Sequence, residues 1–175
     1  VDPSAHTAWE VDTRHLAGSW GLYSTYTRLA GTISGVGYLA GFHHRQADGF
    51  RDANSDYAVF QGQAKLKLRL SERWGLTVDF SGSSTESGEP GRLTLTQYQA
   101  NREQTVRRYD RLFVERYVPR VTLEGEVSAQ TQLTLTAWAG HQDRLSRRQN
   151  GNGTWMNLDQ QIFDFVGLDT RFRHG

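Results

Sequence analysis

The chain has 175 residues, a length that fits one domain or part of a larger one. Its 20 basic and 19 acidic side chains leave a formal net charge of +1, so charge gives no argument for nucleic acid as a partner. Because the sequence contains no cysteine, disulfide frameworks and thiolate metal sites are excluded.

The first quarter of the chain has weak strand patterns. Residues 9–16, 22–33 and 38–47 are compatible with strands, and the stretch 34–37 is a tight turn between the second and the third. The glycines of residues 31–41 surround this turn and do not stand between a strand and a helix. We therefore reject a phosphate-binding loop there.

The alternation of apolar and polar residues is clearest in residues 58–81. Every second residue of 58–70 is small or apolar, the residues between them are mostly polar, and 74–80 repeat the pattern. Only residues 71–73 separate the two runs. Period two is typical of a strand with one apolar and one polar face, so the runs predict a long hairpin.

The second half of the chain repeats this pattern. Residues 116–127 and 133–139 alternate around the short stretch 128–131, and residues 161–173 form a last strand. This makes about eight strands in all. The chain is therefore predicted to be all-β and antiparallel.

One short helical turn is expected inside the longest connection. It covers residues 96–99, where Thr96 and Gln99 have the spacing of a capping box. No apolar run approaches the roughly 18 residues of a membrane-spanning helix.

Strand and loop lengths distinguish between kinds of all-β protein. Soluble strands most often have about 5–6 residues, tilted membrane strands need about 9–11, and the runs here extend over about 11–17. Short connections at 34–37, 71–73 and 128–131 alternate with longer polar ones at 48–55, 82–108 and 145–158. This asymmetry is typical of outer-membrane barrels, which have short periplasmic turns and longer extracellular loops.

Single residues bear on the barrel prediction. Trp74 at a short turn and Trp20 near the opposite rim suit the aromatic girdles of a bilayer, although tryptophans also cap soluble sheets. On the polar face, which would line the lumen, Lys65 and Lys67 are expected opposite Asp79 and Thr77 as a structural ladder. Because Pro119 removes a ladder hydrogen bond inside a strand, we expect a bulge there or different strand bounds.

Five features of the sequence carry a resemblance to a known family. They are Gly-Ser-Trp-Gly at 18–21, Gly-Phe-Arg-Asp-Ala-Asn-Ser-Asp-Tyr at 49–57, the alternating strand ending at 68–71, Pro-Gly at 90–91 before Leu-Thr at 93–94, and a Gln- and Asn-rich loop that ends in Asp110-Arg111. Their order and spacing resemble the first third of the barrel of TonB-dependent outer-membrane receptors, especially the ferric-dicitrate and ferric-siderophore branch. The resemblance covers most of residues 9–148.

This resemblance implies a barrel of about 22 strands whose lumen is filled by a plug. Residues 1–175 would be one incomplete barrel domain without the plug. We expect an internal segment, because no signal peptide or TonB-contacting box is visible, and we expect that the segment alone does not transport. The implied function is import of a ferric chelate across the Gram-negative outer membrane, with the TonB complex acting through the plug. Outer-membrane lipid and lipopolysaccharide would surround the barrel.

Arginines of the longer loops are the candidate ligand residues. A ferric chelate is anionic, and guanidinium forks bind anions well. We predict that six of them bind ligand: Arg92, Arg107, Arg108, Arg111, Arg144 and Arg147. Arg102 and Arg148 lie in the same loops. The alternatives for each are contact with lipopolysaccharide phosphates or solvation, and Arg51 is expected to tie its own loop to Asp52 or Asp56.

No metal, cofactor or catalytic site is expected. His43 and His44 are adjacent, so they should point to opposite faces of a strand and cannot chelate together with His141. His43 should share the lumen face with Arg45, where the two side chains are expected to meet. Without cysteine or a Gly-x-Ser-x-Gly elbow, no spacing singles out a nucleophile and a base, and we expect no enzyme.

Two other classes stay open at this point. One is a self-contained eight-stranded outer-membrane barrel that acts as an adhesin or a structural protein. The other is a soluble carbohydrate-binding β-sandwich, in which a second sheet would cover the apolar face around Leu68.

Overall fold

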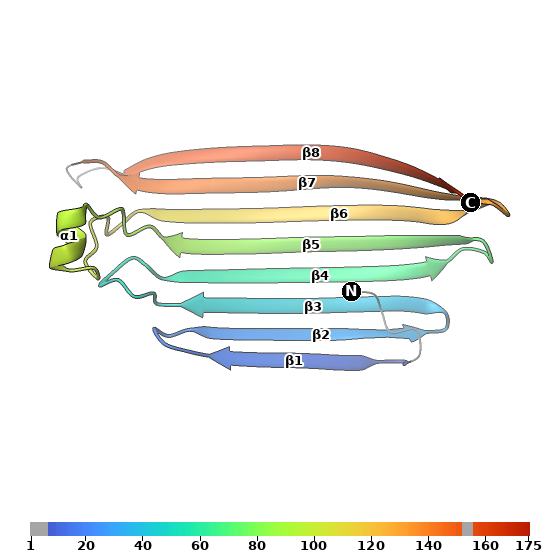
Figure 1. The fold of residues 1–175 in the computed structure, drawn as a ribbon, viewed down its shortest axis with the longest axis horizontal. Helices are drawn as coiled ribbons and strands as arrows, with labels where there is room; N and C mark the ends of the chain where they lie inside the picture. Colours follow the sequence, from blue (N-terminus) through green and yellow to red (C-terminus); the bar gives the residue numbers. More distant parts are fainter. Residues whose placement is uncertain (1–6, 152–155) are drawn as a thin grey trace.

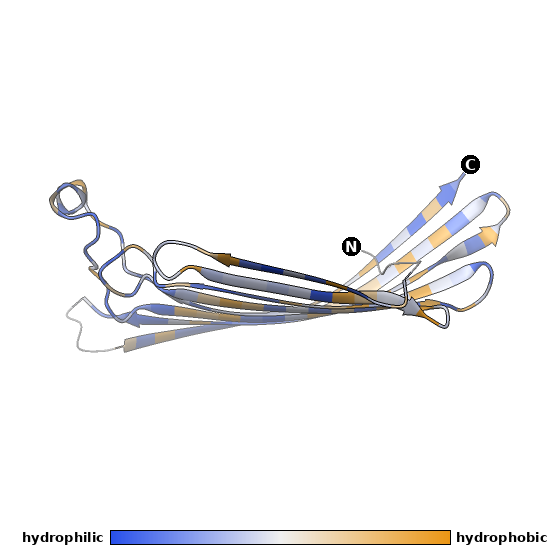
Figure 2. Ribbon diagram, turned by 90° about the horizontal axis from the view of Figure 1, so that it is seen from below, coloured by the Kyte–Doolittle hydropathy of each residue, from blue (hydrophilic) through white to orange (hydrophobic). Residues whose placement is uncertain are grey.

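The computed structural model describes residues 7–151 and 156–175. It confirms the all-β prediction: eight antiparallel strands form one sheet, in which each strand pairs with its neighbours in the sequence (Figure 1). The strands are β1 Glu10–Ala17, β2 Tyr23–Ile33, β3 Val36–Ala47, β4 Tyr57–Arg69, β5 Trp74–Gly88, β6 Arg111–Ser128, β7 Thr131–Gln149 and β8 Met156–His174. The sheet is strongly curved but not closed, as in a section of a barrel (Figure 2).

The connections confirm the predicted asymmetry. The connections of two to four residues, 34–35, 70–73 and 129–130, lie at one end of the sheet, and the other described connections lie at the opposite end together with α1, Leu95–Ala100 (Figure 1). Strands β5 to β8 are longer than predicted, up to 19 residues in β7 and β8. Residues 82–88, 145–149 and 156–158, which the sequence pattern places in loops, belong to strands.

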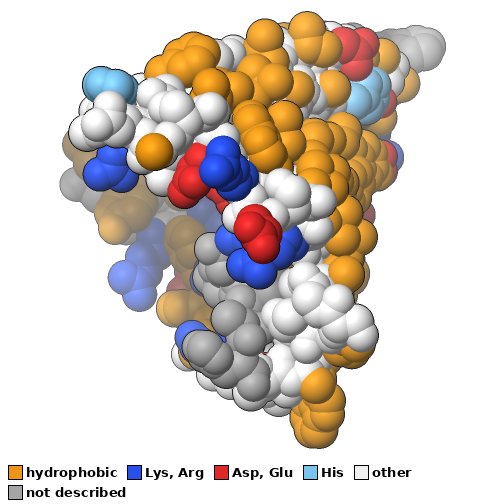
Figure 3. Space-filling model, turned by 90° about the vertical axis from the view of Figure 1, so that its right-hand side faces the viewer, with side chains coloured by type: hydrophobic (Ala, Val, Ile, Leu, Met, Phe, Trp, Pro, Cys, Tyr) orange, Lys and Arg blue, Asp and Glu red, His pale blue; other side chains and the backbone are white. Residues whose placement is uncertain are grey.

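The register gives the sheet two chemically different faces. Leu66, Val78 and Val121 lie directly opposite one another on β4, β5 and β6, and Ala137 and Leu168 continue this row on β7 and β8. We call the face with this row the outer face and the opposite one the inner face. Figure 3 looks onto the short turns and shows hydrophobic side chains gathered along one flank of the molecule.

The outer face is apolar but uncovered. Among the described residues only Ala30 and Leu39 are buried hydrophobic side chains, whereas Leu66 is 48% exposed and Leu168 is 67% exposed. A β-sandwich would bury this face under a second sheet, and the described residues form a single sheet. The sandwich alternative is therefore wrong. The open edges at β1 and β8 also mean that the eight strands do not close into a barrel of their own in this structure.

The inner face confirms the expected ladder. Lys65 lies opposite Asp79, and Lys67 lies opposite Thr77. Lys67 also forms an ion pair of 3.9 Å with Glu124 of β6.

Two local predictions need correction. The helical turn exists, but Thr94 rather than Thr96 caps it: the Thr94 hydroxyl accepts from the Gln97 N–H, and the Gln97 side chain accepts from the Thr94 N–H at 2.9 Å. Pro119 causes no bulge. Pro119 stays paired with β5 but has no partner on β7, and the register between β6 and β7 is the same before and after it. An extended strand can lack one N–H donor without needing an extra residue. The shift in β6 lies instead between Glu126 and Ser128, beside the turn.

Among the described residues, no helix has the length and apolar character needed to cross a membrane.

Candidate binding surface of the inner face

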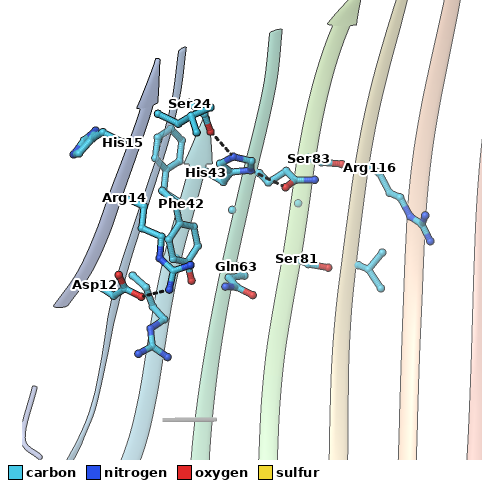
Figure 4. A pocket seen from close by; sticks show the side chains of 18 of the residues that line it. Asp12, Arg14, His15, Ser24, Phe42, His43, Gln63, Ser81, Ser83 and Arg116 are labelled. Carbon is cyan, nitrogen blue, oxygen red and sulfur yellow. Dashed lines mark hydrogen bonds and ion pairs between the residues drawn. The ribbon is translucent and has the colours of Figure 1, made fainter. Parts of the chain in front are cut away.

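A hollow of about 1370 Å³ lies on the inner face over β1 to β6 (Figure 4). Its lining includes four arginines and one carboxylate: Arg14, Arg28, Arg116, Arg120 and Asp12. The side chains come together because residues two apart on a strand share a face and neighbouring strands are in register. The surface is therefore polar with an excess of positive charge, which suits water and anionic groups.

Some of this charge is neutralised within the sheet. Arg28 forms an ion pair of 2.7 Å with Glu10, and its side chain is only 14% exposed. Arg14 contacts Asp12 at 3.4 Å. The Arg116 guanidinium lies 5.5 Å from the centre of the Phe165 ring. These positions follow from the period-two pattern of β1, β2 and β6, but only loop arginines were predicted as ligand residues, so these were not among them.

His43 forms the centre of a polar chain across three strands. Its Nε2 lies 3.1 Å from Ser24 Oγ, and its Nδ1 lies 3.2 Å from Gln61 Oε1 (Figure 4). With a proton on Nδ1, His43 donates to Gln61 and accepts from the Ser24 hydroxyl. The described hydrogen bonds of His43 go to Ser24 and Gln61 and not to Arg45, whose guanidinium lies 5.8 Å from the Tyr57 ring centre.

Ser24, His43 and Gln61 are connected in the same order as the nucleophile, the base and the orienting group of a hydrolase triad. Acyl transfer also needs donors for an oxyanion. The backbone N–H groups around Ser24 belong to strands paired on both sides, so they point along the sheet rather than into the hollow. The expectation that the chain is not an enzyme stays a prediction.

His44 lies on the other face, as predicted. Its ring stacks on Phe60 at 4.2 Å, on the outer face. Among the described residues no group of three or more histidine and carboxylate side chains is placed to hold a metal ion.

The two longest described loops are fastened together above the sheet. Asp52 N–H donates to Glu103 O at 2.7 Å, and Ala53 and Thr105 exchange two hydrogen bonds. The Asn54 side chain donates to the carbonyl oxygens of Arg107 and Asp110, both at 2.7 Å. Loop 48–56 and loop 89–110 therefore form one body.

Arg51 joins this body by a different contact from the one expected. Its guanidinium donates to Gln104 O at 2.8 Å, rather than pairing with Asp52 or Asp56. The carbonyl lies in the other loop, a partner that local spacing does not reveal.

Arg111 is held by two carboxylates. Its Nη2 lies 2.7 Å from Asp56 Oδ2 and 2.8 Å from Glu86 Oε1. The hydrogen bond from Arg111 lowers the pKa of Asp56 below its ordinary value, against the opposing effect of partial burial. An arginine in this position stabilises the loop body, and its predicted role in ligand binding is untested.

The other predicted arginines are spread over three places. Arg92 and Arg108 are exposed in loop 89–110, where Arg107 donates to Gln149 O at 2.9 Å. Arg144 and Arg147 belong to β7 and not to a loop, because both faces of the strand are polar there. Arg144 donates to Gln161 Oε1 at 3.1 Å, and Arg147 lies 5.7 Å from the Phe113 ring centre. Arg102 and Arg148 are exposed, and Arg148 donates to Ser146 Oγ at 3.1 Å. Ligand binding by any of them stays a prediction.

An aromatic band crosses the outer face. The rings of Phe42 and Phe60 lie 6.1 Å apart, and those of Phe80 and Tyr117 stack at 6.4 Å. On the short-turn side of this band the outward side chains are mostly apolar, whereas Glu115 of β6 lies in the same row as Phe60 and Glu86 of β5 lies on the loop side. The band has the composition of a membrane–water interface.

The predicted tryptophans lie at the ends of the sheet. Trp74 begins β5 at the short turns. Trp20 lies in the connection between β1 and β2 and packs edge-to-face on Phe50, with ring centres 6.5 Å apart. The phenylalanines and Tyr117 of the aromatic band were not predicted, although their place in the alternating pattern is visible in the sequence.

Comparisons with known proteins bear on the fold. No protein-family model matches the chain, and no curated protein matches it. Among solved structures it is similar to the ferric citrate transporter FecA in its unliganded form, with a TM-score of 0.78 and 18% sequence identity. The match covers 95% of this chain and 25% of that one, so the chain spans a quarter of the length of this transporter. At this identity the likeness shows the fold alone, that of a section of a β-barrel.

Proposed function

We propose that the chain is part of an outer-membrane transporter of the TonB-dependent class, which imports an anionic iron chelate such as ferric citrate or a ferric siderophore. The observation that carries the proposal is the two-faced sheet of long strands. Its apolar outer face is uncovered, and its inner face is polar and rich in arginine. A lipid bilayer outside and an aqueous lumen inside satisfy both faces. The fold likeness to FecA supports this reading.

The proposal gives each part of the molecule a role. The strands form part of the wall, and the loop body faces the outside of a Gram-negative cell. The inner face would contact a plug that the TonB complex acts on. The arginines of the loops would attract the chelate by charge, and the segment would carry out no covalent chemistry.

The test is uptake of labelled iron by cells that express the full-length gene product. Ferric citrate and a catecholate siderophore are supplied separately, in strains with and without a functional TonB complex. We expect TonB-dependent uptake of at least one chelate. Location outside the outer membrane, or no uptake of any chelate by a folded protein in that membrane, would contradict the proposal.

A second arm of the same assay tests the exposed arginines. The double variant Arg92→Ala with Arg108→Ala removes two exposed charges whose side chains do not fasten the loop body. We expect weaker apparent affinity for the chelate with unchanged protein level. Arg73→Ala, an exposed arginine at a short turn on the opposite end, is the matched control. Unchanged affinity in the double variant would refute ligand binding by this pair.

A further inference from the structure

An aromatic patch lies on the inner face of β7 and β8, beside the hollow. It consists of Trp138 of β7 and of Phe163 and Phe165 of β8. Trp138 lies opposite Arg120 in the register, and the Arg116 guanidinium lies 5.5 Å from the centre of the Phe165 ring. The three rings are therefore on the same face as the two arginines, which line the hollow.

Two glycines make room for two of these rings. The Phe165 ring lies over Gly140 of β7, and the Trp138 ring lies over Gly167 of β8, in places that a side chain at either glycine would occupy. Each ring therefore leans across the neighbouring strand instead of standing upright on the sheet. Trp138 and Phe165 are half-buried and Phe163 is 48% exposed, so the patch is a shallow platform of accessible aromatic surface.

Positive charge is in excess beside the patch. On the inner face of β4 to β8, the three rows of the sheet that contain the patch carry three cations and one carboxylate, namely Lys65, Arg116, Arg120 and Asp79. Arg116 extends from β6 over β7, toward the rings (Figure 4). Within residues 7–151 and 156–175, the Arg120 side chain has no hydrogen bond or ion pair. Asp169, further along β8, is paired with Arg171 at 2.8 Å. The rings therefore have two guanidinium groups beside them that suit an anion.

The patch lies at the height of the aromatic band. Arg116 and Tyr117 are neighbours in β6, and they belong to the inner patch and to the outer band, respectively. In the membrane orientation of the proposed function, this height is the outer end of the membrane-spanning section, on the side of the longer loops. A ligand that enters from outside the cell therefore reaches the patch before it reaches the inner surface near the short turns.

We propose that the inner face selects an iron chelate whose iron-binding groups are both aromatic and anionic, namely catecholates, in preference to ferric citrate. Catechol rings stack on Trp138 and Phe165, while Arg116 and Arg120 bind the negatively charged oxygens. Citrate offers anionic oxygens but no ring, so it would leave the aromatic platform in contact with water. The inference deepens the proposed function and rests on it, and it differs from the chelate named for the structural neighbour.

The test compares the binding of two chelates to the purified full-length protein. A ferric tris-catecholate and ferric dicitrate, each labelled with radioactive iron, are titrated separately in detergent micelles. We expect the wild type to bind the tris-catecholate at least about tenfold more tightly. The double variant Trp138→Leu with Phe165→Leu keeps apolar side chains beside the glycines but removes the rings. It should weaken binding of the tris-catecholate about tenfold and change binding of ferric dicitrate by less than about twofold.

Further variants control for folding and for charge. Phe80→Leu with Tyr117→Leu removes a stacked pair at the same height on the outer face, and it should leave both affinities unchanged. Phe163→Ala removes a ring that is 48% exposed, so it should selectively weaken tris-catecholate binding even if the double variant at the glycines fails to fold. Arg116→Gln with Arg120→Gln should weaken binding of both chelates, because both are anionic.

The outcomes distinguish this inference from the proposed function. Tighter binding of ferric dicitrate by the wild type, with TonB-dependent uptake, would overturn the inference and leave transport standing. Equal weakening of both chelates by the ring variants would show that the rings support the shape of the inner face, and it would also overturn the inference. Binding of neither chelate by the folded protein would overturn both proposals. Ring-dependent binding of the tris-catecholate without any uptake would leave the selectivity standing and remove the transport function.

Discussion

Asn54 links the two long loops from a backbone conformation that few side chains adopt. Its φ is 54°, in the left-handed region, and its side-chain amide donates to two carbonyl oxygens of loop 89–110. Asparagine suits both demands, because it tolerates this region better than most residues and carries two donors.

Substitutions at Asn54 should therefore loosen the loop body in a graded way. Asn54→Gly keeps the conformation but loses both hydrogen bonds, at a cost of about 1–3 kcal/mol in local stability. Asn54→Asp should cost more, because a carboxylate oxygen would face carbonyl oxygens. Amide hydrogen exchange of residues 103–107 is the measurement, and equal protection in the wild type and in both variants would show that the two bonds do not hold the loops together.

The ion pair of Asp56 with Arg111 makes part of this stability depend on pH. Arg111 lowers the pKa of Asp56 in the folded protein, so the ionised form stabilises the fold. This contribution is complete above the ordinary pKa of 3.8 and is lost as the pH falls through the lowered value. Because the Asp56 side chain is 44% exposed, we expect no more than about 1 kcal/mol.

The pH prediction is checked by limited proteolysis of the loop body between pH 6 and pH 2.5 with an acid-stable protease. Susceptibility of the wild type should rise at the acid end, after correction for enzyme activity. Asp56→Asn, which cannot ionise, should remain equally susceptible across the range. Parallel profiles for the two proteins would contradict the assignment.

Residue contacts of this kind are beyond sequence reasoning. Asp56 and Arg111 are 55 residues apart, and their contact depends on how two loops fold over the end of the sheet. The sequence identified arginine as the important basic residue, but spacing could not tell an arginine that fastens a loop from one that is free to meet a ligand.

At the level of elements, the strands continue beyond the point where their pattern ends. Between Trp74 and Phe80 the two faces of β5 alternate, but from Ser81 to Ser87 both faces are polar and the strand continues. Period two appears only where one face meets an apolar surrounding. The sequence pattern therefore identifies the apolar section of each hairpin. The continuation of the strands with polar residues on both faces was predicted as loops.

The apolar section predicts a dependence on depth. Leu66 lies in the middle of the outer row of β4, and Leu70 lies at the short turn. In a membrane, Leu66→Arg should destabilise the protein by about 2–4 kcal/mol, whereas Leu70→Arg should cost about 0–1 kcal/mol. Leu68→Arg should fall between them.

Urea unfolding in lipid vesicles measures these differences for the full-length protein. Its outcome depends on what covers the outer face. Equal effects at the three leucines would argue against a bilayer around β4, because protein burial does not vary with distance from a membrane interface.

For the whole molecule, the sequence predicted the topology better than the shape. Runs joined by three or four residues can only pair with each other, so the order of strands followed from residues 71–73 and 128–131. The curvature and the hollow of the inner face arise from the twist accumulated over eight paired strands, which no local pattern encodes. For this reason the candidate surface with Arg28 and Arg116 became visible only in three dimensions.

The meander also bears on how the protein is made. Every strand pairs only with the strands next to it in the sequence, so each hairpin can join the growing sheet without waiting for distant parts of the chain. Each addition costs the entropy of closing one loop. The longest described loop is 89–110, between β5 and β6. Until the next hairpin arrives, however, the last strand offers its free N–H and C=O groups to any partner. Wrong pairing should therefore be most frequent during biogenesis after β5 has joined the sheet and before β6 follows residues 89–110, because β5 is then the unpaired edge strand.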